Sequence, residues 1–250
     1  MKLCRRAERL ACFFCKGQLM GYFYDGLLKA ADMLLNMDAA TFSAVEATLV
    51  STTCALICAM ILGLPLGFLI GYTNFPGKKL ARLVSDTLLA FPTVLIGLLV
   101  YIFITYRGPL GHLGLLFTVP GMVIGQTILA LPIIISWTAQ AIENLDPRCR
   151  QTLLTLGANP MQTALHTIRE VRYDLAMVCV TAFGRVVTEV GVAMMLGGNV
   201  RYHTRTMTTA ISLETSKGEF AQGIALGIVL LGIAFIVNAA LTWLRHKGRA

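Results

Sequence analysis

Residues 47–77, ATLVSTTCALICAMILGLPLGFLIGYTNFPG, contain no charged side chain. A helix needs about 20 consecutive apolar residues to cross the hydrocarbon core of a bilayer, at about 1.5 Å of rise per residue. This stretch meets that requirement, and so does a second uncharged stretch at residues 220–244. The chain is therefore expected to be an integral membrane protein.

The composition of the 250 residues indicates the same class. Hydrophobic residues make up 56% of the chain and charged residues only 14%, whereas soluble globular domains have roughly 25% charged residues. Apolar runs separated by basic connections predict an all-α membrane protein with about five transmembrane helices. These helices are expected at residues 44–72, 83–105, 119–142, 174–196 and 220–244.

Glycine and proline recur inside the predicted spans, for example at Pro65, Pro92, Gly97, Gly125 and Pro132. Membrane helices tolerate both residues, because neighbouring helices can satisfy the carbonyl groups that a proline frees. We therefore expect kinks or close packing at these positions, and no helix breaks.

The orientation of the spans follows from the basic residues in their connections, since cytoplasmic loops carry an excess of lysine and arginine. One set of alternate connections holds ten basic residues and the opposite set holds four. The ten are Lys78, Lys79, Arg82, Arg148, Arg150, Arg169, Arg172, Arg245, Lys247 and Arg249. The C-terminus is therefore expected to be cytoplasmic.

The basic N-terminal segment conflicts with that topology. Five crossings would leave the N-terminus outside, yet residues 2–16 hold five basic side chains. Two explanations stay open: translation starts at Met20 instead of Met1, or residues 19–37 form a sixth crossing. The charges inside that segment, at Asp25, Lys29 and Asp32, favour an amphipathic interfacial helix and hence five crossings.

The connection at residues 143–173 is too long and too polar for a simple linker. Asp146 followed by Pro147 is typical of the start of a helix, and Gly157 is typical of the left-handed residue that ends one. A short helix, a glycine turn and a second helix would present a rigid knob to a cytoplasmic partner.

This connection resembles the coupling loop of the permeases of ATP-binding-cassette (ABC) importers, with Gly157 at the glycine of the family pattern and QTL in place of its Glu-Ala-Ala. Over residues 42–244 the chain is similar to the tungstate or molybdate type of these permeases, most specifically over residues 184–218. The motifs are LAFPTV (89–94), GLLVY (97–101), RGPLG (107–111), IREVR (168–172), FGR (183–185), TEVG (188–191), GGN (197–199), HTR (203–205), TTA (208–210) and LETSKG (213–218).

The resemblance implies the type I ABC importer permease fold and a division of labour. A periplasmic or lipid-anchored binding protein would deliver a tetrahedral oxyanion, two copies of this chain would form the path through the bacterial inner membrane, and a cytoplasmic ATPase dimer would bind the ATP. The chain would be no enzyme and would need no cofactor, and it contains no G-x-x-x-x-G-K-[ST] phosphate loop. The coupling residues would be Gln151, Leu156, Gly157, Ala158 and Pro160.

The implied domain organisation has three parts. Residues 1–40 form a basic and amphipathic N-terminal segment, residues 41–245 form the permease domain with its coupling loop at 143–173, and residues 246–250 form a cytoplasmic tail. Tungstate is the expected substrate. Molybdate has nearly the same charge and shape and stays open as an alternative, with sulfate as a third candidate.

Two charged residues in the fourth predicted span, Arg185 and Glu189, are four positions apart and so share a helix face. Charges inside a membrane segment normally face a partner or an aqueous path. Two interpretations stay open: the two residues pair and hold the helix packing, or they line or gate the path together with Gly191.

A polar loop follows that span, and its guanidinium and hydroxyl groups suit a tetrahedral oxyanion. It is expected either to contact the anion or the binding protein, or to be an ordinary solvated loop. The candidate residues are Asn199, Arg201, Thr204, Arg205, Thr208 and Thr209.

Other functional classes fit the sequence less well. Nucleic-acid binding is excluded because the basic residues form no stripe with interleaved aromatics, and no two histidines have the spacing of metal ligands. An intramembrane enzyme would need a facing nucleophile and base, and neither H-E-x-x-H nor G-x-S-x-G occurs. An ATP-independent channel or secondary transporter remains the alternative from a different class, although five spans do not divide into two equal repeats.

Overall fold

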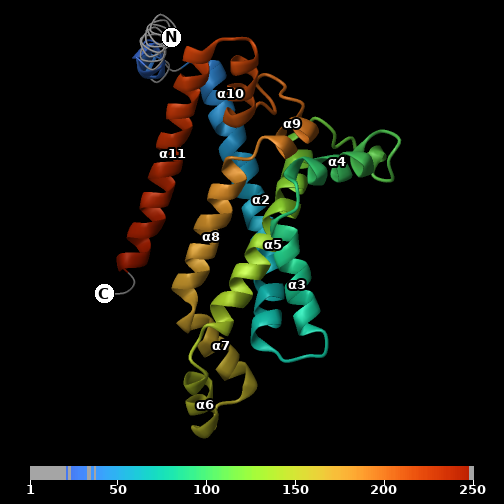
Figure 1. Ribbon diagram of the computed structural model, residues 1–250, viewed down its shortest axis with the longest axis vertical. Coiled ribbons are helices and arrows are strands. Elements are labelled where there is room, and N and C mark those ends of the chain that lie inside the picture. The colour runs from blue at the N-terminus through green and yellow to red at the C-terminus, as the bar shows by residue number, and fades with distance from the viewer. Residues whose placement is uncertain (1–20, 22–23, 33–34, 37, 248–250) are drawn as a thin grey trace, which may run out of the picture.

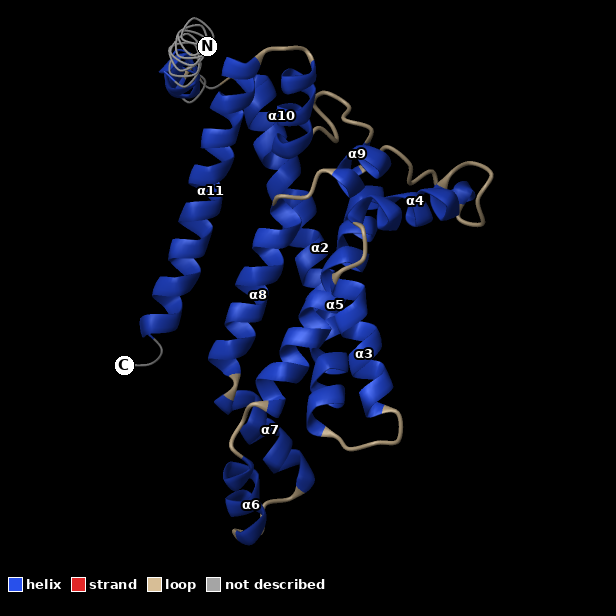
Figure 2. Cartoon of the chain, in the orientation of Figure 1, coloured by secondary structure: helices blue, strands red, loops and turns tan. Residues whose placement is uncertain are grey.

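The computed structural model describes residues 21, 24–32, 35–36 and 38–247. Every regular element among these residues is a helix, as Figure 2 shows. The residues described therefore confirm the predicted all-α class.

Two long helices, α2 (Ala39–Tyr72) and α5 (Val119–Glu143), form the centre of the molecule (Figure 1). Small residues recur every fourth position of α2, at Ala55, Ala59, Gly63, Gly67 and Gly71, and so lie on one face. A Cβ atom at Gly67 would lie 2.7 Å from the backbone oxygen of Ile135 in α5. Small side chains let the two backbones approach, as is common between membrane helices.

The second predicted span, residues 83–105, is not one continuous helix. It consists of α3 (Lys78–Leu89) and α4 (Thr93–Ile104), which are bent by 99° at residues 90–92. The expectation of a kink without a break at Pro92 was therefore wrong. Pro92 has an extended backbone, with ψ 123°, and proline also disfavours helical geometry at the residue before it. By contrast Pro65 and Pro132 stay inside α2 and α5, as expected.

The fourth predicted span, residues 174–196, is also broken. It consists of α8 (Arg172–Val187) and the short α9 (Gly191–Gly197), at an angle of 60°. An apolar cluster packs α9 against α4 and α5 and holds the bend. Its buried members are Ile96, Val100, Ile104, Met122, Leu129, Val192, Ala193 and Leu196.

The remaining helices complete the bundle. The helices α10 (Met207–Ser216) and α11 (Phe220–Lys247) pack against each other through a turn at Gly218, whose φ is +85°. A single 3-10 turn, η1 (Gly111–Leu113), follows α4. Two further helices, α6 (Pro147–Thr155) and α7 (Pro160–Glu170), lie beyond the ends of α5 and α8 (Figure 1).

Within the described part of the chain, α2, α5 and α11 are each long and apolar enough to span a membrane, and the two bent pairs bring the total to as many as five spans. This agrees with the predicted number. Residues 24–32 are helical and lie at the end of the molecule opposite α6 and α7 (Figure 1). The basic cluster at residues 2–16 and much of the alternative sixth crossing at 19–37 lie outside the described residues.

Candidate functional site

The predicted knob is a helix, a glycine turn and a second helix: α6 (Pro147–Thr155) and α7 (Pro160–Glu170). The Asp146 carboxylate accepts a hydrogen bond from the Arg148 amide at 2.9 Å and caps α6. Gly157 has a φ of +79°, in the left-handed region, where glycine carries no steric cost. Asn159 and Gln162 cap α7 reciprocally, at 2.8 and 2.9 Å. The sequence prediction for this local structure is confirmed.

The tip of the knob is apolar and exposed. Leu156 and Met161 are each 77% exposed, and Leu154 is 53% exposed. Of the predicted coupling residues, Gln151, Leu156, Gly157 and Pro160 are exposed and Ala158 is half-buried, and all five lie on these two helices and their turn. Exposed large apolar side chains on a rigid element are typical of a protein interface. Their contact with an ATPase stays a prediction.

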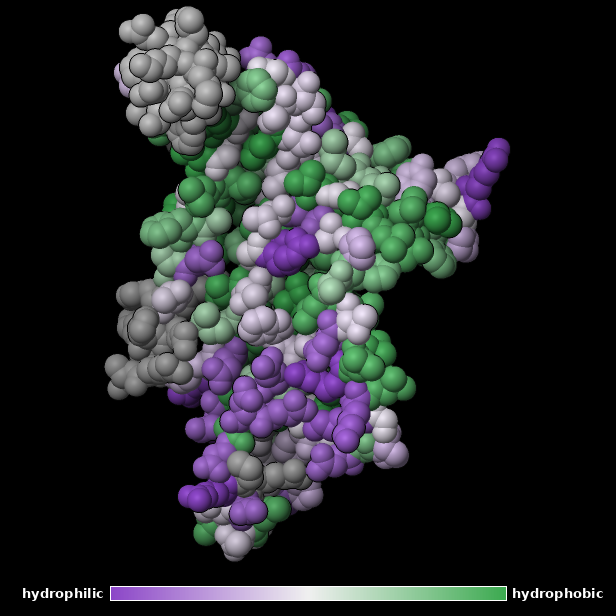
Figure 3. All heavy atoms as spheres, in the orientation of Figure 1, coloured by the Kyte–Doolittle hydropathy of each residue, from purple (hydrophilic) through white to green (hydrophobic). Residues whose placement is uncertain are grey.

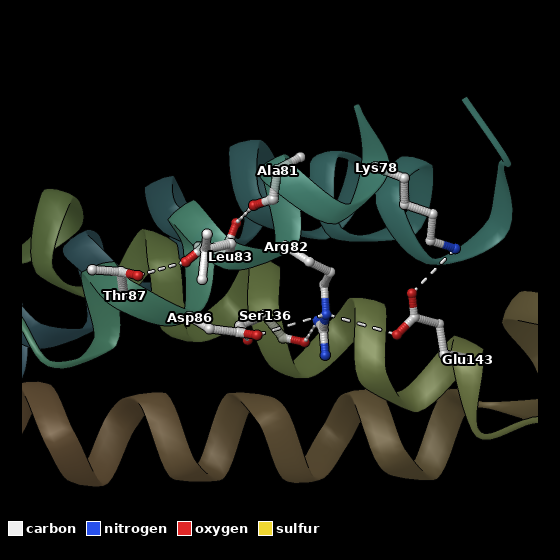
Figure 4. A network of polar contacts seen from close by, with 9 residues as sticks. Lys78, Ala81, Arg82, Leu83, Asp86, Thr87, Ser136 and Glu143 are labelled. Carbon is white, nitrogen blue, oxygen red and sulfur yellow. Dashed lines mark hydrogen bonds and ion pairs between the residues drawn. The ribbon is translucent and has the colours of Figure 1, made fainter. Parts of the chain in front are cut away.

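A network of charges joins α3 to the end of α5 that leads into α6 (Figure 4). Lys78 Nζ lies 3.1 Å from the Glu143 carboxylate, and Arg82 Nε lies 3.7 Å from it. Arg82 also donates to the Ser136 carbonyl at 2.6 Å, and the Ser136 hydroxyl donates to Asp86. The sequence analysis treated Lys78 and Arg82 only as topology signals, because their partners are far away along the chain.

Arg185 and Glu189 form an ion pair at 3.0 Å across the end of α8. Glu189 is only 5% exposed, and its second carboxylate oxygen accepts the amides of Gly191 at 2.9 Å and Val192 at 3.3 Å. The carboxylate therefore binds both sides of the break between α8 and α9. The Arg185 side chain is 44% exposed, which leaves part of its guanidinium facing outward.

Gly191 sits where the break meets α4. A Cβ atom there would lie 3.0 Å from the Val94 side chain and 3.2 Å from the Glu189 carboxylate. A larger residue would therefore push α9 away from α4 or disturb the carboxylate that caps it. Whether these residues line a path stays a prediction.

The loop after α9 is folded around Asn199, which has a φ of +53°. Its side-chain oxygen accepts hydrogen bonds from Arg205 Nε and the Thr209 hydroxyl, both at 3.1 Å. The Thr208 hydroxyl donates to the Glu189 carbonyl at 2.9 Å, and the Thr204 hydroxyl donates to the Gly197 carbonyl. The structure thus brings these predicted residues together.

Within this loop the threonines and the arginines are placed differently. Thr204, Thr208 and Thr209 are buried, and their hydroxyls bond within the fold. Arg201 is exposed and Arg205 half-buried, and both line a cavity of about 580 Å³ together with residues of α2, α10 and α11. A role of this loop in binding an anion or a binding protein stays a prediction.

Asp38, at the start of α2, lies in the same cavity. The Thr41 hydroxyl donates a hydrogen bond to its carboxylate at 2.7 Å, and this bond, helped by the charge of Arg201, holds the pKa of Asp38 below its usual value. The cavity thus combines a stably ionised carboxylate with two guanidinium groups.

Comparison with known proteins agrees with this architecture. Residues 63–249 match the family described as "Binding-protein-dependent transport system inner membrane component". The tungstate uptake system permease protein TupB of Campylobacter jejuni is 45% identical over 95% of this chain and 98% of its own length. A probable anion ABC transporter permease protein of Haloferax volcanii is 37% identical over 79% of this chain and 87% of its own.

Solved structures share the fold at low sequence identity. The inward-facing MetNI methionine ABC transporter has a chain with a TM-score of 0.69 and 17% identity, covering 85% of this chain and 97% of that one. A bacterial ABC transporter that imports the acidic polysaccharide alginate has a chain with a TM-score of 0.67 and 18% identity, covering 82% and 79%.

The fold is therefore the predicted type I ABC importer permease fold. The chain is a membrane permease that belongs to the family of binding-protein-dependent transport system inner membrane components.

Proposed function

We propose that this chain is the permease subunit of an ABC importer that carries tungstate across the bacterial cytoplasmic membrane. The observation that carries the proposal is the 45% identity, over nearly the full length of both chains, to a permease named for tungstate uptake. Molybdate is the closest alternative substrate because it is also a tetrahedral dianion, and sulfate is the next. A positively charged path would suit all three.

The proposed assembly divides the work among several chains. A cytoplasmic ATPase dimer docks on α6 and α7, and binds and hydrolyses the ATP, so this chain itself catalyses no reaction. Two copies of the chain, surrounded by membrane lipid, enclose the path. A periplasmic or lipid-anchored binding protein releases the oxyanion onto the opposite end, above the loop at residues 199–209. In this assembly residues 41–245 act as the permease domain and residues 143–173 as its coupling loop.

The connection between α7 and α8 supports a mechanical role for the knob. Val171 both ends α7 and precedes α8, is 1% exposed, and accepts a hydrogen bond from the Leu175 amide at 2.9 Å. No flexible linker separates the two helices, so a displacement of α7 by the ATPase would tilt α8. Glu143 links the other end of the coupling loop to α3. Closure of the ATPase dimer would thus move both bent spans.

Uptake into proteoliposomes tests this proposal. Vesicles contain this chain, its ATPase and its binding protein, and the accumulation of tungstate, molybdate and sulfate is compared with and without ATP on the ATPase side. We expect ATP-dependent accumulation of tungstate. Equal uptake without ATP would replace the proposal by a channel or secondary carrier, and ATP-dependent uptake of only molybdate or sulfate would correct the substrate.

A further inference from the structure

Polar side chains recur on one face of α8. Asp174, Thr181, Arg185 and Thr188 are all exposed, and their spacings of seven, four and three residues place them within about 60° of one another on an α-helix. We call these four residues the α8 stripe. Between Leu175 and Val187 the other residues of α8 are apolar.

The side of α8 next to the α8 stripe is packed against the centre of the molecule. Val178, Ala182 and Val186 are at most 3% exposed and belong to a cluster with residues of α2 and α5. The helix therefore has a fixed rotation, with the apolar side held inward and the α8 stripe facing out. A sliding or rotation of α8 that buried Arg185 would have to expose this cluster.

The outward side of the α8 stripe cannot be lipid without a large penalty. The guanidinium of Arg185 is charged, and charged residues within membrane segments normally face an aqueous cavity or another protein surface. Figure 3 shows a hydrophilic patch beside the upper part of α8, surrounded by apolar and weakly polar surface. The position of this patch within the apolar zone indicates an aqueous surface in the assembled transporter.

We propose that the α8 stripe forms a wall of the translocation path and that Arg185 is its contact for the oxyanion. The inference rests on the proposed function, in which the same face of a second copy closes the path. Two copies would then supply two guanidinium groups to a doubly charged tetrahedral anion. Arginine suits this task because its planar fork of donors matches the oxygens of an oxyanion.

Glu189 is a positioning residue in this arrangement and does not compete for the anion. Its side chain is 4% exposed, and the carboxylate already accepts hydrogen bonds from Arg185 Nη1, Gly191 and Val192. These donors offset its charge and fix one nitrogen of the guanidinium. The remaining donors of Arg185 lie on a half-exposed side chain and are available to a ligand.

Thr181 and Thr188 extend the site along the helix. Their hydroxyls donate to backbone carbonyls one turn back, Thr181 to Met177 at 2.9 Å and Thr188 to Gly184 at 3.0 Å. Within the α-helix the Met177 carbonyl also accepts the Thr181 N–H, so the Thr181 hydroxyl can rotate toward a passing anion and leave that carbonyl paired. The α8 stripe therefore offers two weak donors, Thr181 and Thr188, beside the positive charge of Arg185. Its carboxylate, Asp174, lies in the first turn, toward the other end of the helix.

A labelling experiment tests the aqueous exposure of the α8 stripe without depending on the substrate. Thr181→Cys is compared with Thr87→Cys in reconstituted complexes treated with a sulfonate-bearing methanethiosulfonate reagent, and the modified peptides are measured by mass spectrometry. Thr87 is the matched control because it is exposed, donates to Leu83 at 2.7 Å, and lies on an apolar face of α3 with exposed Leu80 and Leu83. The wild-type chain gives the background from native cysteines.

We expect Thr181→Cys to react at least about tenfold faster than Thr87→Cys, because only a thiol in contact with water becomes a reactive thiolate. Equal, slow labelling of both positions would overturn the inference. Transport gives the second readout: Arg185→Gln should lower ATP-dependent oxyanion uptake about tenfold or more, Arg185→Lys less, and Thr87→Val not at all.

The two readouts separate the inference from the proposed function. Wild-type uptake that is unchanged in Arg185→Gln would overturn the role of Arg185 and leave the importer intact. Absence of ATP-dependent uptake in the wild type would overturn the proposed function, while the labelling would still decide whether the α8 stripe faces water.

Discussion

Gly157 connects α6 to α7 with a φ of +79°, and the space where a Cβ atom would lie is open, with nothing within 4 Å. The glycine is therefore required by backbone geometry and not by crowding. A non-glycine residue in the left-handed region costs roughly 1–2 kcal/mol, and asparagine is among the residues that tolerate it best. Replacing Gly157 by valine and by asparagine therefore separates the effect of backbone strain from the effect of losing glycine itself.

We expect Gly157→Val to reduce ATP-dependent uptake severalfold, because the strained turn would displace α6 relative to α7 at the surface offered to the ATPase. Gly157→Asn should keep most of the activity, since it can adopt the same backbone angle. Both are measured by uptake in proteoliposomes, with expression level as a control for folding. Full activity of Gly157→Val would show that the geometry of this turn is not needed for coupling.

Glu189 is a second residue whose role is local, since it holds the break between α8 and α9. In Glu189→Gln the side-chain oxygen can still accept the Gly191 and Val192 amides, but the amide group repels the guanidinium of Arg185. We expect the free energy of unfolding to fall by roughly 1–3 kcal/mol, the usual cost of a mismatched buried polar group. The measurement is the apparent Tm of the detergent-solubilised chain.

The variant Glu189→Ala, which also removes the amide contacts, is the companion measurement and should lower the Tm further. An unchanged Tm in both variants would mean that the apolar packing of α9 alone fixes the bend.

At the scale of the element, the ion pairs between α3 and α5 should matter more for coupling than for stability. Lys78 and Glu143 are only partly buried, with side-chain exposures of 23% and 31%, and such pairs contribute about 0.2–1 kcal/mol. They nevertheless connect α3 to the residue that precedes α6. We expect Lys78→Glu to lower uptake severalfold while the Tm changes little.

The charge-swapped double variant Lys78→Glu/Glu143→Lys is the control for that prediction. It restores an opposite-charge pair between positions 78 and 143, but it replaces the carboxylate 3.7 Å from Arg82 by a second positive charge. It should recover part of the uptake. If the single and double variants transport equally poorly, restoring the pair between positions 78 and 143 is not sufficient. The loss then comes from the Lys78 hydrogen bond to the Gly71 carbonyl at 3.2 Å, or from repulsion between Arg82 and the lysine introduced at position 143.

Elements whose ends follow local rules could be predicted from the sequence, and those shaped by distant contacts could not. The Asp146 cap and Gly157 fix α6 through neighbouring residues alone. Pro92 breaks its span, whereas Pro132 does not, and no local pattern distinguishes them. Pro132 is buried within α5, where neighbouring helices surround it. The pairing of Arg82 with Ser136 is likewise non-local, and for this reason the sequence analysis missed it.

At the scale of the whole molecule, the distribution of apolar surface indicates that one chain is an incomplete unit. Of the 18 most apolar consecutive residues of α5, 61% are buried within the chain, compared with 22% for the corresponding stretches of α2 and α11. Leu231, Phe235 and Ile236 of α11 are each about 70% exposed. Lipid covers such surface, but the polar α8 stripe needs another partner. The predicted spans lie at the right places in the chain, although two of them are broken. The proposed two-copy assembly would cover the polar surface that the single chain leaves exposed.

The knob formed by α6 and α7 provides the last prediction, which concerns assembly. Leu156 and Met161 are each 77% exposed, so an aspartate at either position meets no packing conflict within the chain. Burying an aspartate in an apolar partner groove costs several kcal/mol unless it is paired. We expect Leu156→Asp/Met161→Asp to abolish co-purification of the ATPase while the chain keeps its own Tm. Leu113→Asp, at an exposed leucine of η1 far from the knob, is the matched control and should co-purify normally. Retention of the ATPase by the double variant would place the docking surface elsewhere on this end of the molecule, and loss in the control as well would point to a general effect of added charge.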